Sequence, residues 1–178
     1  MKLLSDLLYD VRILEVRGTT HVAVEHIALD SRKVQPLGLF VAVPGATVDG
    51  HDYIDTAIGS GATCVVCERM PEDTPDHVTV VQVKSSATAL GHIAAAFHNH
   101  PSREMKVVAV TGTNGKTTTV SLLHQLFRLL DRKVGMLGTV ENRIVDRMVP
   151  ATHTTPDALS LQSLLREMAD AGCTHVFM

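Results

Sequence analysis

The chain has 178 residues, of which 45% are hydrophobic and 20% charged, ordinary values for a globular protein of one large domain or two small ones. A net charge of −3 and six aromatic residues, four Phe and two Tyr, argue against a surface that binds nucleic acid. No apolar run is long enough to cross a membrane, and Ser5 and Asp6 interrupt the apolar N-terminus, which argues against a signal peptide. We therefore expect a cytoplasmic, monomeric protein whose partners include neither a membrane nor a nucleic acid.

The first hundred residues predict a separate α/β unit. Leu3, Leu7 and Leu8 indicate a short opening helix, and a polar loop from Asp30 to Arg32 separates the first two strands. The expected strands cover 22–29, 39–43, 63–67 and 78–83, and the expected further helices cover 53–60 and 87–97. The polar, proline-bearing stretch 98–104 is the best linker candidate, so we expect one domain over 1–100 and part of a second over 105–178.

Cys64 and Cys67 form a C-x-x-C pattern of the kind that can hold zinc or carry out redox chemistry. Both lie within an expected strand, where residues three apart face opposite sides, and the sequence has no second cysteine pair. We interpret both thiols as core side chains. His98 and His100 lie at a helix end beside a proline, and we expect no metal site there either.

The most informative stretch follows the apolar run 107–110 and reads Thr111-Gly112-Thr113-Asn114-Gly115-Lys116-Thr117-Thr118 before a helical pattern begins. A strand, a glycine-bracketed turn and a helix in this order are typical of a phosphate-binding loop. Glycines let backbone N–H groups turn toward phosphate oxygens, and the N-terminus of a helix attracts anions. Lys116 would reach the outer phosphates of ATP, and the Thr117 hydroxyl would bind Mg²⁺.

The residues after this loop predict a parallel sheet covered by helices, because strands and helices alternate. A strand is expected over 133–137, ended by Gly138, and another over 175–178. Thr155-Pro156-Asp157 predicts the start of a helix with Thr155 as its N-cap, and Gly172 its end. The helix over 117–131 is expected to bury one leucine stripe, made of Leu122, Leu123, Leu126, Leu129 and Leu130.

Three strands are few for a nucleotide-binding domain, and the last would leave an apolar flank uncovered. We therefore expect the chain to be the N-terminal portion of a longer protein. A small self-contained domain is the alternative.

The loop 111–118 resembles the nucleotide loop of the Mur ligases and folylpolyglutamate synthetases, which are ATP-dependent amide-forming enzymes. Ala28-Leu29-Asp30-Ser31-Arg32, followed by 39–45 and Asp49-Gly50-His51, resembles the uridine-nucleotide domain of Mur ligases. His153-Thr154-Thr155-Pro156-Asp157 resembles the substrate loop of the MurE type, which adds the third residue of the peptidoglycan stem. Two places depart from the family pattern: Leu37-Gly38 replaces the usual Gly-Asp before Leu39-Phe40, and His153 replaces a common Asn.

The resemblance implies a small N-terminal α/β uridine-nucleotide domain followed by a truncated, parallel-sheet P-loop ATPase domain. The implied enzyme uses ATP and Mg²⁺ to join a diamino acid to UDP-N-acetylmuramoyl-L-Ala-D-Glu through an acyl phosphate. Lys116 and Thr117 would act on the transferred phosphoryl group. The other implied contacts are Gly112, Thr113, Asn114, Gly115 and Thr118 with ATP, Leu29, Ser31, Ala46, Thr47 and Val48 with the uridine end, and His153, Thr154 and Thr155 with the muramoyl-dipeptide.

In the resembled family, a glutamate after the third strand, a carbamylated lysine and a C-terminal domain complete the metal and amino-acid sites. All three would lie beyond Met178, so we expect this chain by itself to be inactive. That C-terminal domain also selects between diaminopimelate and lysine.

Several of these residues also have plain structural interpretations. Ser31 and Arg32 would cap a turn, and Thr155 would cap a helix. Leu29 would lie in the core, and His51 would face solvent or cap the next helix. Three alternatives also remain for the function: a P-loop kinase or GTPase switch, a complete non-catalytic nucleotide-binding module, and a folylpolyglutamate synthetase-like ligase.

Overall fold

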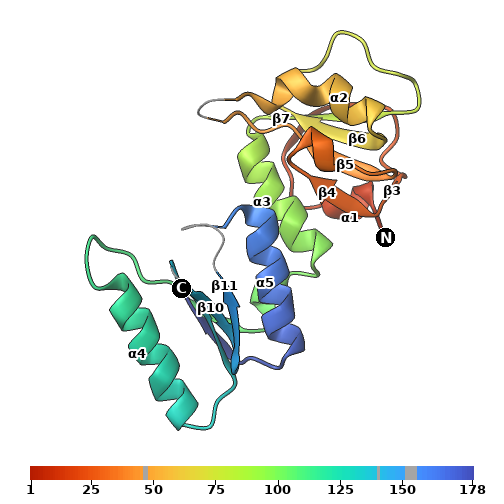
Figure 1. Ribbon diagram of the computed structural model, residues 1–178. Helices are drawn as coiled ribbons and strands as arrows, with labels where there is room; N and C mark the ends of the chain where they lie inside the picture. The colour runs from red at the N-terminus through yellow and green to blue at the C-terminus, as the bar shows by residue number, and fades with distance from the viewer. Residues whose placement is uncertain (46–47, 140, 151–155) are drawn as a thin grey trace. The chain divides into compact units, whose positions relative to one another are not determined.

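The computed structural model describes residues 1–45, 48–139, 141–150 and 156–178, which form two compact units, Met1–Phe97 and His98–Met178 (Figure 1). Each unit contains its own five-stranded sheet with helices packed on it, so the predicted α/β class is confirmed. In the described part of the chain, every helix is too short or too polar to span a bilayer.

The sheet of the first unit has the order β2-β7-β6-β5-β4. The four strands β4 to β7 are parallel, β2 pairs antiparallel with β7, and β1 and β3 form a separate antiparallel ribbon. The elements are β1 (Lys2–Leu3), α1 (Leu4–Leu7), β2 (Ile13–Arg17), β3 (Ala23–Val24), β4 (His26–Ala28), η1 (Ser31–Lys33), β5 (Gly38–Val41), η2 (Gly50–Tyr53), α2 (Ile54–Gly59), β6 (Ala62–Cys67), β7 (Thr79–Val83) and α3 (Ser86–Phe97).

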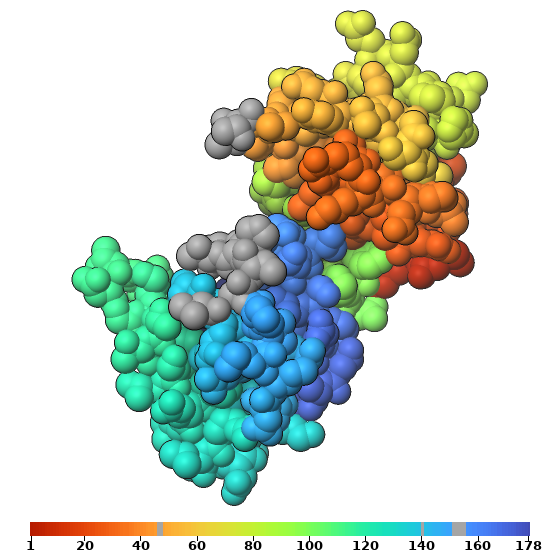
Figure 2. All heavy atoms as spheres, in the orientation of Figure 1, coloured from red at the N-terminus to blue at the C-terminus, as the bar shows by residue number. Residues whose placement is uncertain are grey.

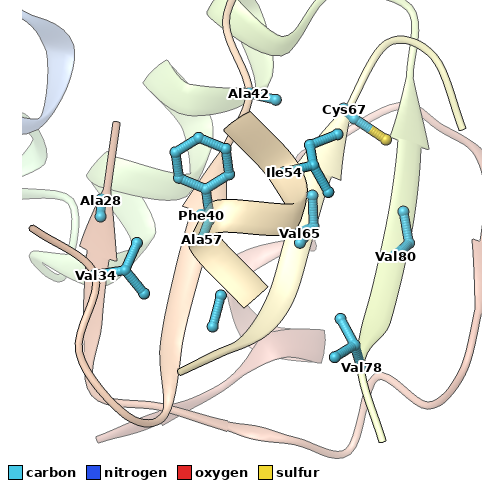
Figure 3. Close-up of a cluster of buried hydrophobic side chains, with 11 residues drawn as sticks. Ala28, Val34, Phe40, Ala42, Ile54, Ala57, Val65, Cys67, Val78 and Val80 are labelled. Atoms are coloured by element: carbon cyan, nitrogen blue, oxygen red, sulfur yellow. The ribbon is translucent and has the colours of Figure 1, made fainter. Parts of the chain in front are cut away.

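The core of the first unit explains why its parallel strands are almost continuously apolar. Parallel strands are covered on both faces, so successive residues of β5 and β6 are buried on alternating sides. Phe40 of β5 and Val65 of β6 pack with Ile54 of α2 in one cluster (Figure 3). The predicted helices and strands of this unit are confirmed, except that the strand expected over 22–29 is divided into β3 and β4.

Strand β2 was not predicted, because all five of its residues are exposed and carry no period-two burial pattern.

The sheet of the second unit has the order β11-β10-β9-β12-β8. Strands β8, β12 and β9 are parallel, and β9, β10 and β11 form an antiparallel meander. The elements are η3 (Pro101–Arg103), β8 (Lys106–Val108), α4 (Lys116–Leu129), β9 (Val134–Leu137), β10 (Glu141–Ile144), β11 (Arg147–Pro150), α5 (Ala158–Asp170) and β12 (His175–Phe177).

Helices α4 and α5 lie on opposite faces of this second sheet (Figure 1). On one face, Val120 of α4 packs with Val134 and Phe177. On the other, Met168 of α5 lies so close to Gly135 of β9 that a Cβ there would come within 2.4 Å of its sulfur. The predicted parallel arrangement of β8, β9 and β12 is therefore confirmed, with one helix on each face.

The antiparallel hairpin of β10 and β11 was not predicted. Its two-residue turn is Val145-Asp146, and Val145 adopts a φ of 56° although turns of this kind favour Asn or Gly. The sequence therefore lacks the usual hairpin signal.

The expectation that the last strand leaves an uncovered flank is wrong. The crossover through α5 places β12 between β9 and β8, so the edge strands of the described sheet are β8 and β11. Val107 and Val108 of β8 are 37% and 38% exposed. The order of strands in a sheet depends on where each crossover helix places the next strand. The order of elements along the chain does not reveal this.

The prediction for the leucine stripe of α4 is also wrong. Leu122, Leu126, Leu129 and Leu130 are between 51% and 83% exposed, and Leu123 is only partly buried. The helix packs instead through Val120, His124 and Phe127, which share an equally regular helical spacing. The atoms of α4 form an outer surface of the second unit (Figure 2).

The predicted start of α5 is two residues too early. The helix begins at Ala158, and the Asp157 side chain is its N-cap, accepting a hydrogen bond from the backbone N–H of Ser160 at 2.9 Å. Pro156 precedes the helix, and Thr155 lies outside the described residues. Gly172, with a φ of 79°, follows the C-cap Ala171, as predicted for the end of this helix.

Burial of His124 predicts an acid-sensitive second unit. Its side chain is 4% exposed, and burial together with the nearby Arg143 and Arg128 lowers the pKa of its imidazole below 6.5. The unfolded chain therefore takes up a proton near pH 6.5, whereas the folded chain does so only at lower pH. Stability should fall as pH drops below about 6.5.

We expect His124→Gln to remove part of this loss, measured as the free energy of unfolding in urea at pH 7.5 and pH 5. His77→Gln supplies the control, because this exposed histidine lies in the first unit and its replacement should leave the unfolding of the second unit unchanged. An unaltered pH dependence in His124→Gln would contradict the prediction.

Candidate functional site

The phosphate-loop sequence connects β8 to α4 in the second unit. The backbone N–H of Val110 donates to the carbonyl of Met178 at 2.7 Å, which fixes the start of the loop. Gly112 and Gly115 have φ values of 152° and 79°, in the region that L side chains rarely adopt. These two glycines therefore allow the chain to reverse and enter α4 at Lys116.

The N-terminus of α4 has the properties of an anion site. Its N-cap is Gly115, and no side chain of the described residues caps the first turn. The N–H groups of that turn are therefore available to a ligand, and the helix dipole favours a negative one. By contrast, Asp157 caps α5.

The ammonium of Lys116 lies over this loop. Its Nζ donates to the carbonyl oxygens of Gly112 at 2.5 Å and Thr113 at 3.3 Å. A cation is thus held beside the uncapped helix N-terminus, where phosphate oxygens could exchange for these carbonyls.

A cavity of about 360 Å³ opens beside the loop. Lys116 and Thr117 line it together with Leu137 at the end of β9 and Met178 after β12. These are the carboxyl ends of parallel strands, where α/β sheets bind ligands. Of the predicted ATP contacts, only Lys116 and Thr117 line this cavity, whereas Gly112, Thr113, Asn114, Gly115 and Thr118 are exposed in the loop and the first turn.

The residues present fit a nucleoside triphosphate with Mg²⁺. The uncapped first turn and the ammonium of Lys116 are suited to phosphate oxygens, and the Thr117 hydroxyl is a hard oxygen ligand for Mg²⁺. Within the described ranges there is no group of three His, Cys, Asp or Glu side chains that would hold a metal ion unaided. A nucleotide-bound Mg²⁺ takes part of its coordination from the phosphates, so one hydroxyl ligand from this loop is compatible with such an ion.

Three of the predicted uridine contacts lie at the carboxyl edge of the first sheet. Leu29 and Ser31 follow β4, and Val48 follows β5, and these two strands are parallel neighbours. The segments that follow them therefore leave the same edge of the sheet. Leu29 is half-buried, Ser31 is 6% exposed and Val48 is 53% exposed.

The turn cap in this region is Asp30, not Ser31 or Arg32. The Asp30 carboxylate accepts from the backbone N–H of Arg32 at 3.0 Å and from its guanidinium at 2.9 and 2.8 Å. These hydrogen bonds lower the pKa of Asp30 to about 2. The interpretation of Ser31 and Arg32 as caps is thus wrong, because the carboxylate preceding them performs that role.

Five of the predicted substrate contacts lie outside the described residues. They are Ala46 and Thr47 in the first unit, and His153, Thr154 and Thr155 in the second.

The expectation for His51 is wrong. Its side chain is 6% exposed rather than facing solvent, and it bonds Asp49 and the backbone of Glu68. Asp49, Glu68 and Arg69 were not identified as partners in the sequence. The motif Asp49-Gly50-His51 was the available signal, but Glu68 and Arg69 reach it only through the pairing of β5 with β6.

Cys64 and Cys67 are confirmed as core residues. Both side chains are 0% exposed, and burial raises the pKa of each thiol to about 11. A thiol with such a pKa remains protonated near neutral pH and is a poor nucleophile and metal ligand.

A second cavity of about 490 Å³ lies beside α4 and is lined by His124, Arg128, Arg143 and Asp146 among others. Arg128 pairs with Asp146, and Arg143 pairs with Glu141 at 2.6 Å. Because both arginines are already neutralised, we assign no anionic ligand to this cavity.

Two sequence models of one family match the chain. "Mur ligase family, catalytic domain" matches residues 23–98, and "Mur ligase middle domain" matches residues 110–178. Similar proteins named UDP-N-acetylmuramoyl-L-alanyl-D-glutamate–2,6-diaminopimelate ligase include one from Cytophaga hutchinsonii, 54% identical over 176 residues, and one from Bacteroides thetaiotaomicron, 44% identical over 176 residues. These matches cover 98% and 99% of this chain but 36% of each relative.

Solved structures agree with this relationship. A UDP-N-acetylmuramoyl-L-alanyl-D-glutamate–2,6-diaminopimelate ligase superposes with a TM-score of 0.76 at 23% identity, over 99% of this chain and 36% of that one, which shows the fold. The MurF ligase from Thermotoga maritima, solved in complex with ADP, superposes with a TM-score of 0.55 at 27% identity, over 86% of this chain and 31% of that one.

The left-handed conformation of Gly115 predicts the effect of a small substitution. Gly115→Ala should lower the free energy of unfolding of the second unit by about 1–2 kcal/mol, because an L side chain is strained at this φ even though no atom lies within 4 Å of the new Cβ. Denaturation in urea, followed by circular dichroism, measures the change.

Gly91→Ala is the matched control. Gly91 lies within α3, where a new Cβ also meets open space but φ is helical, so this change should stabilise the first unit by about 0.5–1 kcal/mol. Equal effects of the two substitutions would contradict the argument.

Proposed function

Because the chain belongs to the Mur ligase family, we propose that it serves an ATP-dependent ligase that adds 2,6-diaminopimelate to UDP-N-acetylmuramoyl-L-alanyl-D-glutamate in peptidoglycan precursor synthesis. The observation that carries the proposal is the phosphate loop, in which Gly112 and Gly115 turn the chain into an uncapped helix beside Lys116. The chain spans 36% of the length of the Cytophaga and Bacteroides relatives, whose names supply the substrate.

Each group of the loop has a distinct role in this proposal. The N–H groups of the first turn of α4 bind phosphate oxygens and orient the terminal phosphoryl group. Lys116 exchanges the carbonyls of Gly112 and Thr113 for phosphate oxygens and neutralises charge on the transferred group. Thr117 is the metal ligand of this chain, and Mg²⁺ bound there with ATP supplies further charge neutralisation.

The loop addresses the central chemical difficulty of amide formation. A carboxylate resists attack by an amine, because its oxygens are poor leaving groups. Transfer of the γ-phosphoryl group from ATP to the D-Glu carboxylate gives ADP and an acyl phosphate. The amine then attacks the acyl carbon, the C–O bond to phosphate breaks, and the amine nitrogen loses a proton as the amide forms.

The first unit binds the uridine end of the substrate in this proposal. Leu29, Ser31 and Val48 contribute from the carboxyl edge of its sheet, together with Ala46 and Thr47. His153, Thr154 and Thr155 contact the muramoyl-dipeptide. We propose that the chain by itself binds ligands without turnover, because it spans only 36% of the Cytophaga relative and the resembled family places its amino-acid site in a C-terminal domain.

Replacing Lys116 tests the phosphate site. Lys116→Ala should weaken ATP binding by about tenfold to a hundredfold, since a hydrogen bond to a charged group contributes about 1.5–3 kcal/mol. Calorimetric titration with Mg-ATP measures the affinity. The exposed Lys106 of the same unit is the control, and Lys106→Ala should bind like the unchanged chain.

Replacing Ser31 tests the uridine site. Ser31→Ala should weaken binding of UDP-N-acetylmuramoyl-L-Ala-D-Glu by about twofold to tenfold, the contribution of one hydroxyl hydrogen bond, in the same kind of titration. Ser60→Ala, which removes an exposed hydroxyl of the first unit, should have no effect.

UDP-N-acetylglucosamine and ATP serve as comparison ligands in this titration. Binding of ATP without binding of either uridine nucleotide would contradict the ligase proposal and favour a P-loop kinase or switch.

A further inference from the structure

The turn that carries Val48 is closed at its base by backbone hydrogen bonds. The N–H of Gly45 donates to the carbonyl of Val48 at 2.9 Å, and the N–H of Gly50 donates to the carbonyl of Val43 at 3.1 Å. Pro44 and Asp49 form an isolated antiparallel bridge between these two bonds. The position of Val48 therefore depends on where Asp49 is held.

Asp49 is held by a buried histidine in a defined protonation state. The Nε2 of His51 accepts the backbone N–H of Glu68 at 2.8 Å, so this nitrogen carries no proton. The proton of the neutral ring is then on Nδ1, which donates to Oδ1 of Asp49 at 2.6 Å. The His51 side chain is 6% exposed, so water competes little for either hydrogen bond.

The carboxylate of Asp49 makes two further interactions. It accepts the backbone N–H of His51 at 3.0 Å and the Arg69 guanidinium at 2.5 Å. Hydrogen bonds from His51, and then from Arg69, lower the pKa of Asp49 to about 2. Asp49 is therefore an anion at neutral pH and a strong acceptor for Nδ1.

Glu68 anchors the other end of this arrangement in the sheet and in a helix. Its carbonyl accepts the Gln82 side chain at 3.0 Å, and its Oε1 accepts the N–H and the hydroxyl of Ser86 at 2.9 and 3.1 Å. Gln82 belongs to β7, and Ser86, 0% exposed, begins α3. Asp49, His51 and Glu68, which we call the His51 bridge, thus join the turn to β7 and α3.

We propose that the His51 bridge positions the turn ends Gly45 and Val48 for the uridine-nucleotide end of the substrate, with His51 acting as a positioning residue. This inference rests on the proposed uridine site. It adds that a histidine fixed as the Nδ1–H tautomer holds Gly45 and Val48, the described ends of the turn, in place before the ligand binds. A purely structural role of His51 would weaken uridine-nucleotide binding only in a variant whose first unit has unfolded.

The tautomer of His51 is tested without any ligand. Nitrogen-15 NMR of the whole chain should show Nδ1 protonated and Nε2 unprotonated at neutral pH. In His51→Ala, the amide of Gly45 should exchange with solvent faster, because the hydrogen bond to Val48 is no longer held. A protonated Nε2, or unchanged exchange at Gly45, would overturn the proposal.

Binding is then tested with UDP-N-acetylmuramoyl-L-Ala-D-Glu and with ATP on the same variants. His51→Ala should bind the uridine nucleotide about tenfold more weakly and bind ATP as before. His51→Gln keeps an acceptor for the N–H of Glu68 and should retain an intermediate affinity. If the alanine variant is unfolded, the affinity of this glutamine variant tests the positioning role of His51. His77→Ala, at an exposed histidine of the same unit, is the control and should bind both ligands normally.

The outcomes separate this inference from the proposed function. Absence of uridine-nucleotide binding by the unchanged chain would refute the uridine site and, with it, the role of the bridge in binding. Normal binding by the unchanged chain together with undiminished binding by His51→Ala and His51→Gln would refute the role of His51 alone.

Discussion

The parallel direction of the strands is the constraint on which both candidate sites depend. Parallel strands need crossovers, and every crossover begins at the carboxyl edge of its sheet. In the first unit this edge carries Ser31 after β4, Val48 after β5 and Glu68 after β6. In the second it carries the phosphate loop after β8 and the cavity wall formed by Leu137 and Met178. Residues distant in sequence are gathered at these edges because the strands run the same way.

Local chemistry was the part of this arrangement that the sequence could predict. The phosphate loop is specified by adjacent residues, since two glycines permit the turn and Lys116 and Thr117 follow at once. The same is true of the buried strands of the first unit, whose almost continuously apolar runs are typical of strands covered on both faces. Burial of Cys64 and Cys67 follows from their place in such a run.

Features set by distant contacts could not be predicted in this way. Helix α4 carries two apolar stripes of similar spacing, and only packing against β9 and β12 determines that Val120 and Phe127 face inward while Leu126 does not. The place of β12 inside the sheet depends on the return of α5. His51 is adjacent to its partner Asp49, but its second partner, Glu68, lies beyond a helix and a strand.

The phosphate loop continues directly from β8, one of the two edge strands of the described sheet. Strand β8 is paired with β12 on one side only, so it can separate without breaking the pairing of β12 with β9. Local opening of this kind exposes a few amides at a small fraction of the global unfolding free energy. A nucleotide that binds the loop only while β8 is paired with β12 would shift the opening equilibrium toward the paired state. Nucleotide binding and protection of the β8 amides from hydrogen exchange are therefore thermodynamically linked.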